Sequence, residues 1–127
     1  MRVKESPIRV LVVDDAPFLR GMVKYFLSYG GYEVCGEAGS GKLAIEMFQY
    51  VRPDLVIMDI IMPDMNGVEA VREIRNIDPS AKILMLSAIS NKPVISLALE
   101  MGASDFLAKP FKRDAFLQKV RQVLRPT

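Results

Sequence analysis

The chain has 127 residues, of which half are hydrophobic and a quarter are charged, and its formal net charge is +2. These values fit one globular domain with a single core, and they do not require nucleic acid or an anionic membrane as a partner. The sequence contains no histidine and a single cysteine, Cys35. These counts exclude an intrachain disulfide, a histidine-dependent catalytic pair and a histidine metal ligand.

The sequence also lacks the marks of an exported or membrane-inserted protein. Residues 1–7 contain no apolar stretch of the kind found in signal peptides, and no apolar run reaches transmembrane length. We therefore expect a cytoplasmic protein without membrane insertion. Residues 1–127 are expected to form a single domain, with residues 1–7 as a flexible N-terminal extension.

Short apolar runs predict five strands, three of them from unbroken runs. In chain order the strands are expected at Val10–Val13, Tyr32–Cys35, Leu55–Met58, Ile83–Leu86 and Asp105–Ala108. Unbroken runs are typical of strands buried on both faces, as in a parallel sheet.

Helical patterns fill the intervals between these strands. Helices are expected over residues 17–29, 41–51, 67–76, 93–101 and 112–125. Pro17 suits the first turn of the first helix, and Ser40 is a suitable cap for the second. The alternation of strand and helix, with right-handed crossovers, predicts a three-layer α/β fold. Its sheet would be doubly wound and flavodoxin-like, with five parallel strands in the order 2-1-3-4-5.

Polar residues follow four of the five predicted strands. Asp14 and Asp15 follow the first strand, Asp59 the third, Ser87 the fourth and Lys109 the fifth. In doubly wound sheets, ligands bind at the carboxyl ends of the strands, near the point where the strand order reverses. The first and third strands are neighbours at that point. The three carboxylates are therefore expected to converge, with the hydroxyl and the ammonium beside them.

This set of residue types suits phosphoryl chemistry. Crowded carboxylates repel one another unless a cation lies among them, and an incomplete set of oxygen ligands favours Mg²⁺. With Mg²⁺ present, Asp59 can attack a phosphoryl group whose charge is shared with the Lys109 ammonium. Each residue also has an ordinary explanation, such as a helix cap, a turn or a surface lysine. Five unrelated ordinary roles at the same edge of one sheet are a less plausible account than a single site formed by all five residues.

Four separated motifs resemble the signature of response regulator receiver domains, and most closely that of stand-alone chemotaxis regulators. The motifs are Val10–Asp15, Asp59–Gly67, Leu86–Ala88 and Lys109–Phe111. The resemblance implies a two-component protein that accepts a phosphoryl group from a histidine kinase and signals by protein contact, with chemotaxis as the favoured pathway. It implies no enzyme beyond self-phosphorylation and slow self-dephosphorylation.

The resemblance also implies roles for the site residues. Asp59 matches the phosphoacceptor, and Lys109 matches the lysine that binds the phosphoryl group. Asp15 matches a direct Mg²⁺ ligand, whereas Asp14 acts largely through water. The backbone carbonyl of Ile61 matches a further ligand. The bond between Lys109 and the following proline is cis in this family.

The switch and the output face are implied in the same way. Ser87 matches the switch hydroxyl, and Phe106 matches the switch aromatic, where chemotaxis members often have tyrosine. The expected output face comprises Lys92, Ile95, Leu99, Phe106 and Lys119. Expected partners are the kinase, a flagellar switch protein and a phosphatase, with no nucleic acid, and the protein is expected to be a monomer or weak dimer. The alternative is a receiver domain taken from a larger regulator or a sporulation-type relay protein.

The helix over residues 93–101 has no charged residue before Glu100, so its inward face has to be inferred from the spacing of its apolar residues. An inward stripe is expected from Val94, Leu97, Ala98 and Met101. Ile95 and Leu99 would then face elsewhere, either under a neighbouring loop or in an exposed apolar patch for a partner. The patch agrees better with the output face that the resemblance implies.

Two other phosphate-handling classes have weaker support. Gly36–Leu43 nearly matches a P-loop, but Leu43 stands where Ser or Thr would bind Mg²⁺. A phosphatase of the haloacid dehalogenase type would require a carboxylate two residues after Asp59, where the chain has Ile61. The resemblance to receiver domains implies instead that Ile61 and Ile89 flank the approach of hydrolytic water. Since neither side chain can orient water, we expect slow dephosphorylation.

Overall fold

The computed structural model describes residues 6–88 and 92–126. The N-terminal extension expected over residues 1–7 falls mostly outside the described residues, and so does Ile89.

Five parallel strands form one sheet in the order β2-β1-β3-β4-β5, which confirms the predicted doubly wound topology. The strands are β1 (Arg9–Val13), β2 (Glu33–Ala38), β3 (Leu55–Asp59), β4 (Ile83–Ala88) and β5 (Asp105–Lys109). Most strands extend further than their apolar runs indicated. Asp59, Ser87 and Lys109 are therefore residues of the strands themselves.

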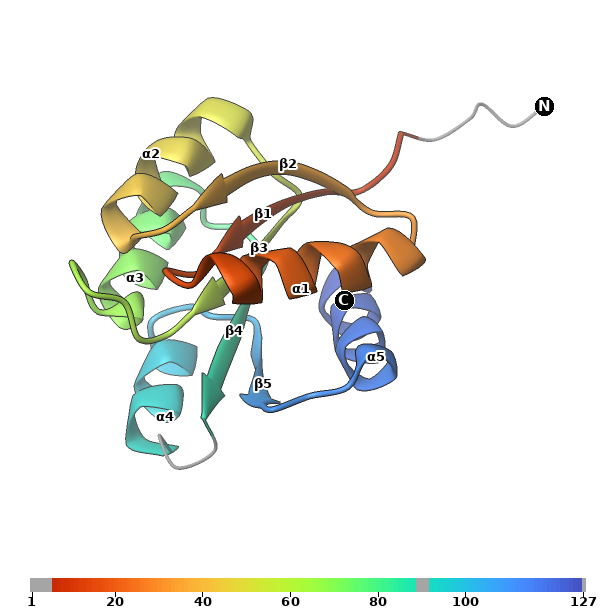
Figure 1. Cartoon of the computed structure of the whole chain (residues 1–127). Helices are drawn as coiled ribbons and strands as arrows, with labels where there is room; N and C mark the ends of the chain where they lie inside the picture. Colours follow the sequence, from red (N-terminus) through yellow and green to blue (C-terminus); the bar gives the residue numbers. More distant parts are fainter. Residues whose placement is uncertain (1–5, 89–91, 127) are drawn as a thin grey trace.

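Two layers of helices enclose the sheet. They are α1 (Pro17–Tyr29), α2 (Gly41–Val51), α3 (Gly67–Ile77), α4 (Lys92–Glu100) and α5 (Arg113–Leu124). Helices α1 and α5 cover one face, and α2, α3 and α4 cover the other (Figure 1). Each helix begins and ends within one residue of its predicted bounds. No helix in the described ranges is both long enough and apolar enough to cross a membrane.

The hydrophobic core lies on both faces of the sheet. In β1, Leu11 and Val13 belong to the cluster under α2, α3 and α4, whereas Val10 and Val12 belong to the cluster under α1 and α5. Successive side chains of a strand point to opposite faces, so a sheet covered on both sides needs apolar residues at consecutive positions. This double burial explains why the runs are unbroken.

The inward stripe predicted for α4 is confirmed for Val94, Ala98 and Met101 and is wrong for Leu97, whose place Ile95 takes. Ile95 is only 6% exposed and packs in the core cluster, whereas Leu97, expected to face inward, is 44% exposed. Ala98 is buried as expected, and Leu99 is 39% exposed. The helix carries no charged residue between Lys92 and Glu100. Polarity therefore could not distinguish its two possible inward stripes, and packing against the sheet decides between them.

The close approach of the start of α3 to the end of β3 generates a testable prediction. A Cβ atom at Gly67 would lie 2.6 Å from the backbone oxygen of Ile60, whereas one at Gly21 would meet no atom within 4 Å. Gly67→Ala should lower the free energy of unfolding by about 2 kcal/mol, because rigid backbone must shift. Gly21→Ala, in the exposed interior of α1, should raise it by about 0.5 kcal/mol. Urea denaturation measures both, and equal effects would contradict the prediction.

Candidate functional site

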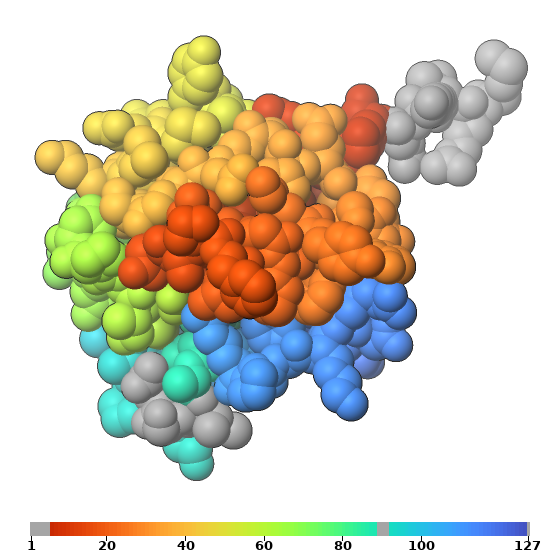
Figure 2. Space-filling view, viewed as in Figure 1, coloured from red at the N-terminus to blue at the C-terminus, as the bar shows by residue number. Residues whose placement is uncertain are grey.

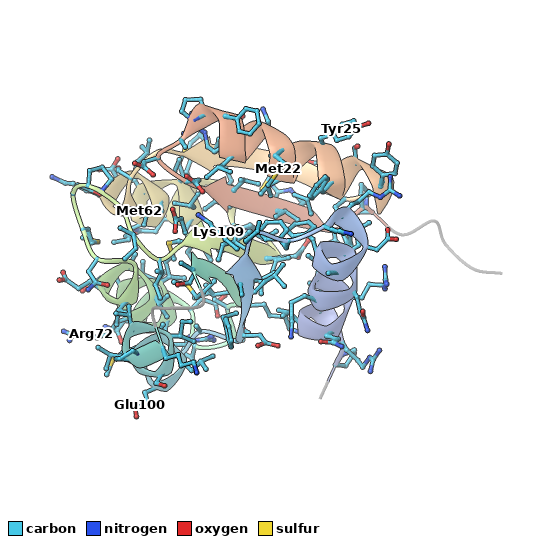
Figure 3. The ribbon with its side chains drawn as sticks, turned by 60° about the horizontal axis from the view of Figure 1, so that its bottom comes forward. Met22, Tyr25, Met62, Arg72, Glu100 and Lys109 are labelled. Carbon is cyan, nitrogen blue, oxygen red and sulfur yellow. The ribbon has the colours of Figure 1, made fainter. Side chains whose placement is uncertain are left out.

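The carboxyl ends of three strands bring the site residues to one edge of the sheet. Asp14 and Asp15 follow β1, Asp59 ends β3 and Lys109 ends β5. Figure 3 shows Lys109 at this edge, between Met22 of α1 and the loop after β3. Strand β5 does not adjoin β3, because β4 lies between them. The long lysine side chain therefore reaches across the end of β4.

The three aspartates form a compact cluster. One carboxylate oxygen from each of Asp14, Asp15 and Asp59 lies within 4.8 Å of the others. Asp14 is 1% exposed and Asp59 is 8% exposed, whereas Asp15 is exposed to solvent. The cluster is thus built from two buried carboxylates and one at the surface, which leaves a side open to ions from solution.

Lys109 supplies the positive charge that faces this cluster. Its Nζ lies 3.2 Å from Asp59 Oδ2 and 3.7 Å from Asp14 Oδ2. The backbone N–H of Ile61 donates a hydrogen bond to Asp59 Oδ1 over 3.3 Å. Both oxygens of Asp59 therefore have a partner that also orients the carboxylate.

The negative charge of Asp14 is less well compensated than that of Asp59. Its Oδ1 accepts a hydrogen bond from the backbone N–H of Ala16 over 2.9 Å. Its Oδ2 is buried and has no hydrogen-bond partner within the described part of the chain. Burial raises the pKa of the Asp14 carboxyl above its ordinary value, and repulsion from Asp59 acts in the same direction. The N–H of Ala16 and the Lys109 ammonium oppose this rise.

The arrangement fits a small divalent cation. A buried carboxylate oxygen without a donor is a site where a cation can replace the missing partner, and oxygen-only ligands favour Mg²⁺ or a similar hard ion. Asp14, Asp15 and Asp59 are the side chains that would hold it. The remaining positions would be filled by backbone oxygen and water, since three carboxylates do not complete an octahedral shell.

Ser87 and Phe106 lie close to the site on neighbouring strands. Ser87 is 1% exposed in β4, where its Oγ donates a hydrogen bond to the backbone oxygen of Ala88 over 3.2 Å. Phe106 lies in β5 opposite Met85 and packs partly buried against the core. The two residues thus lie on the paired strands β4 and β5, where Ser87 is paired with Ala108.

The surface expected to be the output face is only partly exposed. Lys92 is exposed at the start of α4, and Lys119 of α5 forms an ion pair with Asp105 Oδ2 at 3.1 Å. Ile95 does not belong to this surface, because it is buried in the core. Leu97, which was not expected there, contributes exposed apolar area together with Leu99.

A pocket that the sequence did not predict opens beside the cluster. It has a volume of about 350 Å³ and lies between α1 and the segment after β5. Its lining comprises Asp14, Leu19, Met22, Val23, Leu86, Lys109, Pro110 and Phe111. The peptide bond between Lys109 and Pro110 is cis, as expected. The apolar positions of α1 could have indicated a face, but only the packing shows that a hollow remains there.

The P-loop hypothesis is wrong. Strand β2 continues through Ala38, so only Gly39 and Ser40 connect it to α2. The first amides of α2 are also occupied, since Gly41 and Lys42 donate hydrogen bonds to the carboxylate of Asp64. The segment therefore leaves neither the loop nor the free amides that would cradle a nucleotide phosphate.

Comparisons with known proteins agree with this geometry. The family model described as the response regulator receiver domain matches residues 10–121. The chemotaxis protein CheY of Thermotoga maritima is 45% identical over 115 residues, which cover 91% of this chain and 96% of that protein. The chemotaxis protein CheY of Bacillus subtilis is 44% identical over 116 residues, covering 91% and 97%. A chain of the crystal structure of the CheX-CheY-BeF3-Mg+2 complex from Borrelia burgdorferi gives a TM-score of 0.89 at 30% identity, covering 94% and 91%.

The incompletely compensated charge of Asp14 generates a stability prediction. Because its pKa is raised on folding, ionised Asp14 destabilises the folded state at neutral pH, and this penalty disappears as pH falls below its ordinary value of 3.8. In chelator at pH 7, Asp14→Asn should therefore raise the free energy of unfolding by about 1 kcal/mol. The gain should shrink as acid protonates Asp14 in the wild type.

Urea denaturation across a pH series measures this difference. Asp114→Asn is the matched control, because that carboxylate is 89% exposed and should leave stability nearly unchanged. Addition of Mg²⁺ should stabilise the wild type more than Asp14→Asn. An Asp14→Asn protein that is less stable than the wild type in chelator at pH 7 would contradict the argument.

Proposed function

Because the chain belongs to the response regulator receiver family, we propose that it accepts a phosphoryl group from a histidine kinase on Asp59 and signals by protein contact. The observation that carries this proposal is the Asp59 carboxylate, held 3.2 Å from the Lys109 ammonium within a cluster of three carboxylates. A carboxylate next to an ammonium and a metal site has both a nucleophilic oxygen and charge compensation for the incoming phosphoryl group.

In this mechanism a carboxylate oxygen of Asp59 attacks phosphorus while the bond from phosphorus to the donor nitrogen breaks. The N–H of Ile61 and the Lys109 ammonium orient the carboxylate before attack. Lys109 then interacts with the phosphoryl oxygens. When bound, Mg²⁺ supplies further charge neutralisation at those oxygens. Asp14, Asp15, Asp59 and the backbone carbonyl of Ile61 are its proposed ligands.

The signal would leave the site through a change in packing. The phosphoryl oxygens would draw the Ser87 hydroxyl inward, and Phe106 would move into the space released, as a shift between two populated arrangements. The surface that changes would include Lys92, Leu99 and Lys119. Exposed Leu97 extends this output face in place of buried Ile95.

Chemotaxis is the pathway that the relatives favour. The chain matches nearly the whole length of two chemotaxis proteins, 96% of one and 97% of the other. We propose a single receiver domain that acts in the cytoplasm as a monomer or weak dimer, with a kinase, a flagellar switch protein and a phosphatase as partners. The CheX-CheY complex supports a protein partner for such a domain.

The proposal predicts one phosphorylation site. Incubation with Mg²⁺ and acetyl phosphate should add one acyl phosphate that is stable in acid and labile in base. Asp59→Asn should abolish this modification, because the amide is not a nucleophile at neutral pH, whereas Asp114→Asn should leave it intact. Intact-protein mass spectrometry measures the product. Undiminished modification of Asp59→Asn would overturn the assignment.

The proposal also predicts slow loss of the phosphoryl group. The N–H of Ile61 donates to Asp59, and Ile61 is 58% exposed beside this carboxylate, so we propose that its side chain shields the approach of water. A branched apolar side chain is stiff and cannot orient a nucleophile. Ile61→Asn should therefore accelerate decay about tenfold after the donor is removed. Ile61→Val, the apolar control, should decay like the wild type.

Equal decay of Ile61→Asn and Ile61→Val would show that this position does not govern the approach of water. The similar expectation for Ile89 concerns a residue outside the described residues and has to be tested separately, with Ile89→Glu.

A further inference from the structure

The loop between β3 and α3, residues 60–66, is closed tightly at its base. The backbone N–H of Gly67 donates a hydrogen bond to the backbone oxygen of Ile60 over 2.8 Å. The side chain of Ile60 is fully buried, and that of Met62 is 8% exposed. Ile61 lies between these two buried anchors, with its side chain exposed. Its main chain is therefore held on both sides while its side chain faces outward.

A second contact holds the same loop against α2; it consists of the hydrogen bonds from Gly41 and Lys42 to Asp64 and is called the tie below. Asp64 Oδ1 accepts a hydrogen bond from the backbone N–H of Gly41, and Oδ2 accepts one from Lys42, both over 3.0 Å. The hydrogen bond from Lys42, together with that from Gly41, holds the pKa of the Asp64 carboxyl below its ordinary value. The carboxylate is thus charged at neutral pH, and both of its oxygens are engaged.

The contact between the loop and α2 extends beyond these hydrogen bonds. A Cβ atom at Gly41 would lie only 3.0–3.1 Å from three side-chain atoms of Met65, so the glycine lets the loop approach closely. In Figure 2 the green atoms of the loop lie against the gold atoms at the start of α2. The loop therefore packs on the helix end as well as bonding to it.

The beginning of α2 is well suited to hold a carboxylate. The first amides of a helix have no partner within the helix, and the helix dipole favours negative charge there. The segment that resembles a P-loop thus does bind an anion, but the anion is the protein's own Asp64. Ser40 caps the same helix, since its Oγ accepts a hydrogen bond from the N–H of Leu43 over 3.1 Å, and its side chain also hydrogen-bonds to the Asp64 carboxylate.

From these contacts we infer that Asp64 is a positioning residue, which holds the Ile61 carbonyl in place for Mg²⁺ by fastening the β3–α3 loop to the first turn of α2. This inference rests on the proposed function, because it concerns the proposed metal site. Asp64 follows Ile61 by three residues. With the tie removed, the loop keeps the hydrogen bond at its base, the bond from the Ile61 N–H to Asp59, its two buried side chains and the packing of Met65 near Gly41, but it loses its hydrogen bonds to α2. The Ile61 carbonyl then samples other orientations, and each costs metal affinity.

The test is the affinity of the full chain for Mg²⁺, measured by isothermal titration calorimetry without a phosphodonor. Asp64→Ala should raise the dissociation constant about tenfold, the low end of the effects seen for residues that orient metal ligands. Asp64→Asn, which keeps one acceptor oxygen, should give an intermediate value. Asp78→Ala is the matched control, because it removes another carboxylate that accepts hydrogen bonds, here from the N–H and hydroxyl of Ser80, and it leaves the loop tied.

A second control separates positioning from charge. Glu69 lines the same surface hollow as residues 60–66, so Glu69→Gln removes a negative charge near the loop without touching the tie. Asp78→Ala and Glu69→Gln should both bind Mg²⁺ like the wild type. If either control weakens binding as much as Asp64→Ala does, the positioning role is wrong and a general loss of stability or of negative charge explains the weaker binding.

Amide hydrogen exchange in the metal-free protein provides a readout that does not depend on binding. In Asp64→Asn, the amides of Gly41, Lys42 and Gly67 should exchange faster, because both the tie and the base of the loop loosen. In Asp78→Ala the amide of Gly67 should keep its protection. Unchanged exchange at Gly67 in Asp64→Asn would overturn the inference even if Asp64→Ala fails to fold.

The outcomes also separate this inference from the proposed function. Asp15→Ala removes a proposed ligand, so it should abolish binding. A wild type that binds no Mg²⁺, or an Asp15→Ala variant that binds it normally, would overturn both proposals. Normal wild-type binding that is lost in Asp15→Ala but unaltered in Asp64→Ala would overturn only the role of Asp64.

Discussion

The ammonium of Lys109, 3.2 Å from Asp59 and 3.7 Å from Asp14, is the interaction on which the site depends. Two carboxylates that are almost entirely buried would otherwise face each other in a region of low polarity, where an unpaired charge costs several kcal/mol. One ammonium compensates one of the charges and leaves a net negative site. This deficit is the reason that we propose a cation as the further partner of the cluster.

The sheet topology makes this electrostatic arrangement possible. Reversal of the strand order places β1 next to β3, so the aspartates that end both strands share one edge. The lysine has to come from β5, two strands away from β3, and only a long side chain can cross that distance. The two core clusters on either side of the sheet hold the strand ends rigidly. The charges therefore keep their positions although they repel one another.

Polar contacts, together with buried side chains, hold the loops around the site. Ala16 donates to Asp14 at the entry to α1, and Asp64 accepts from the first turn of α2. Each contact pairs a carboxylate with main-chain amides that helix geometry leaves without partners. The segment that resembles a nucleotide-binding loop thus has a structural role, because the amides of Gly41 and Lys42 anchor the loop that follows Asp59.

The sequence by itself determined the helices and strands, and it determined which residues form the aspartate cluster with its lysine. Double burial forced unbroken apolar runs in β1, β3 and β4, and Pro17 and Ser40 stood at the helix starts that the structure shows. Asp14, Asp59 and Lys109 could be identified because each comes at a strand end, and parallel strand ends meet at one edge of the sheet. These features depend on local spacing and on a topology with few alternatives.

Only the tertiary structure decided the rest. The inward face of α4 depends on its packing against the sheet, because a helix without charges on its sides offers two equivalent phases, so Ile95 was misplaced. Asp64 and its partner Gly41 are separated by 23 residues, and no local pattern pairs a loop aspartate with a distant helix end. The pocket between α1 and the segment after β5 is the space that packing leaves unfilled. Such features depend on how side chains from distant segments fit together, which neither periodicity nor spacing encodes.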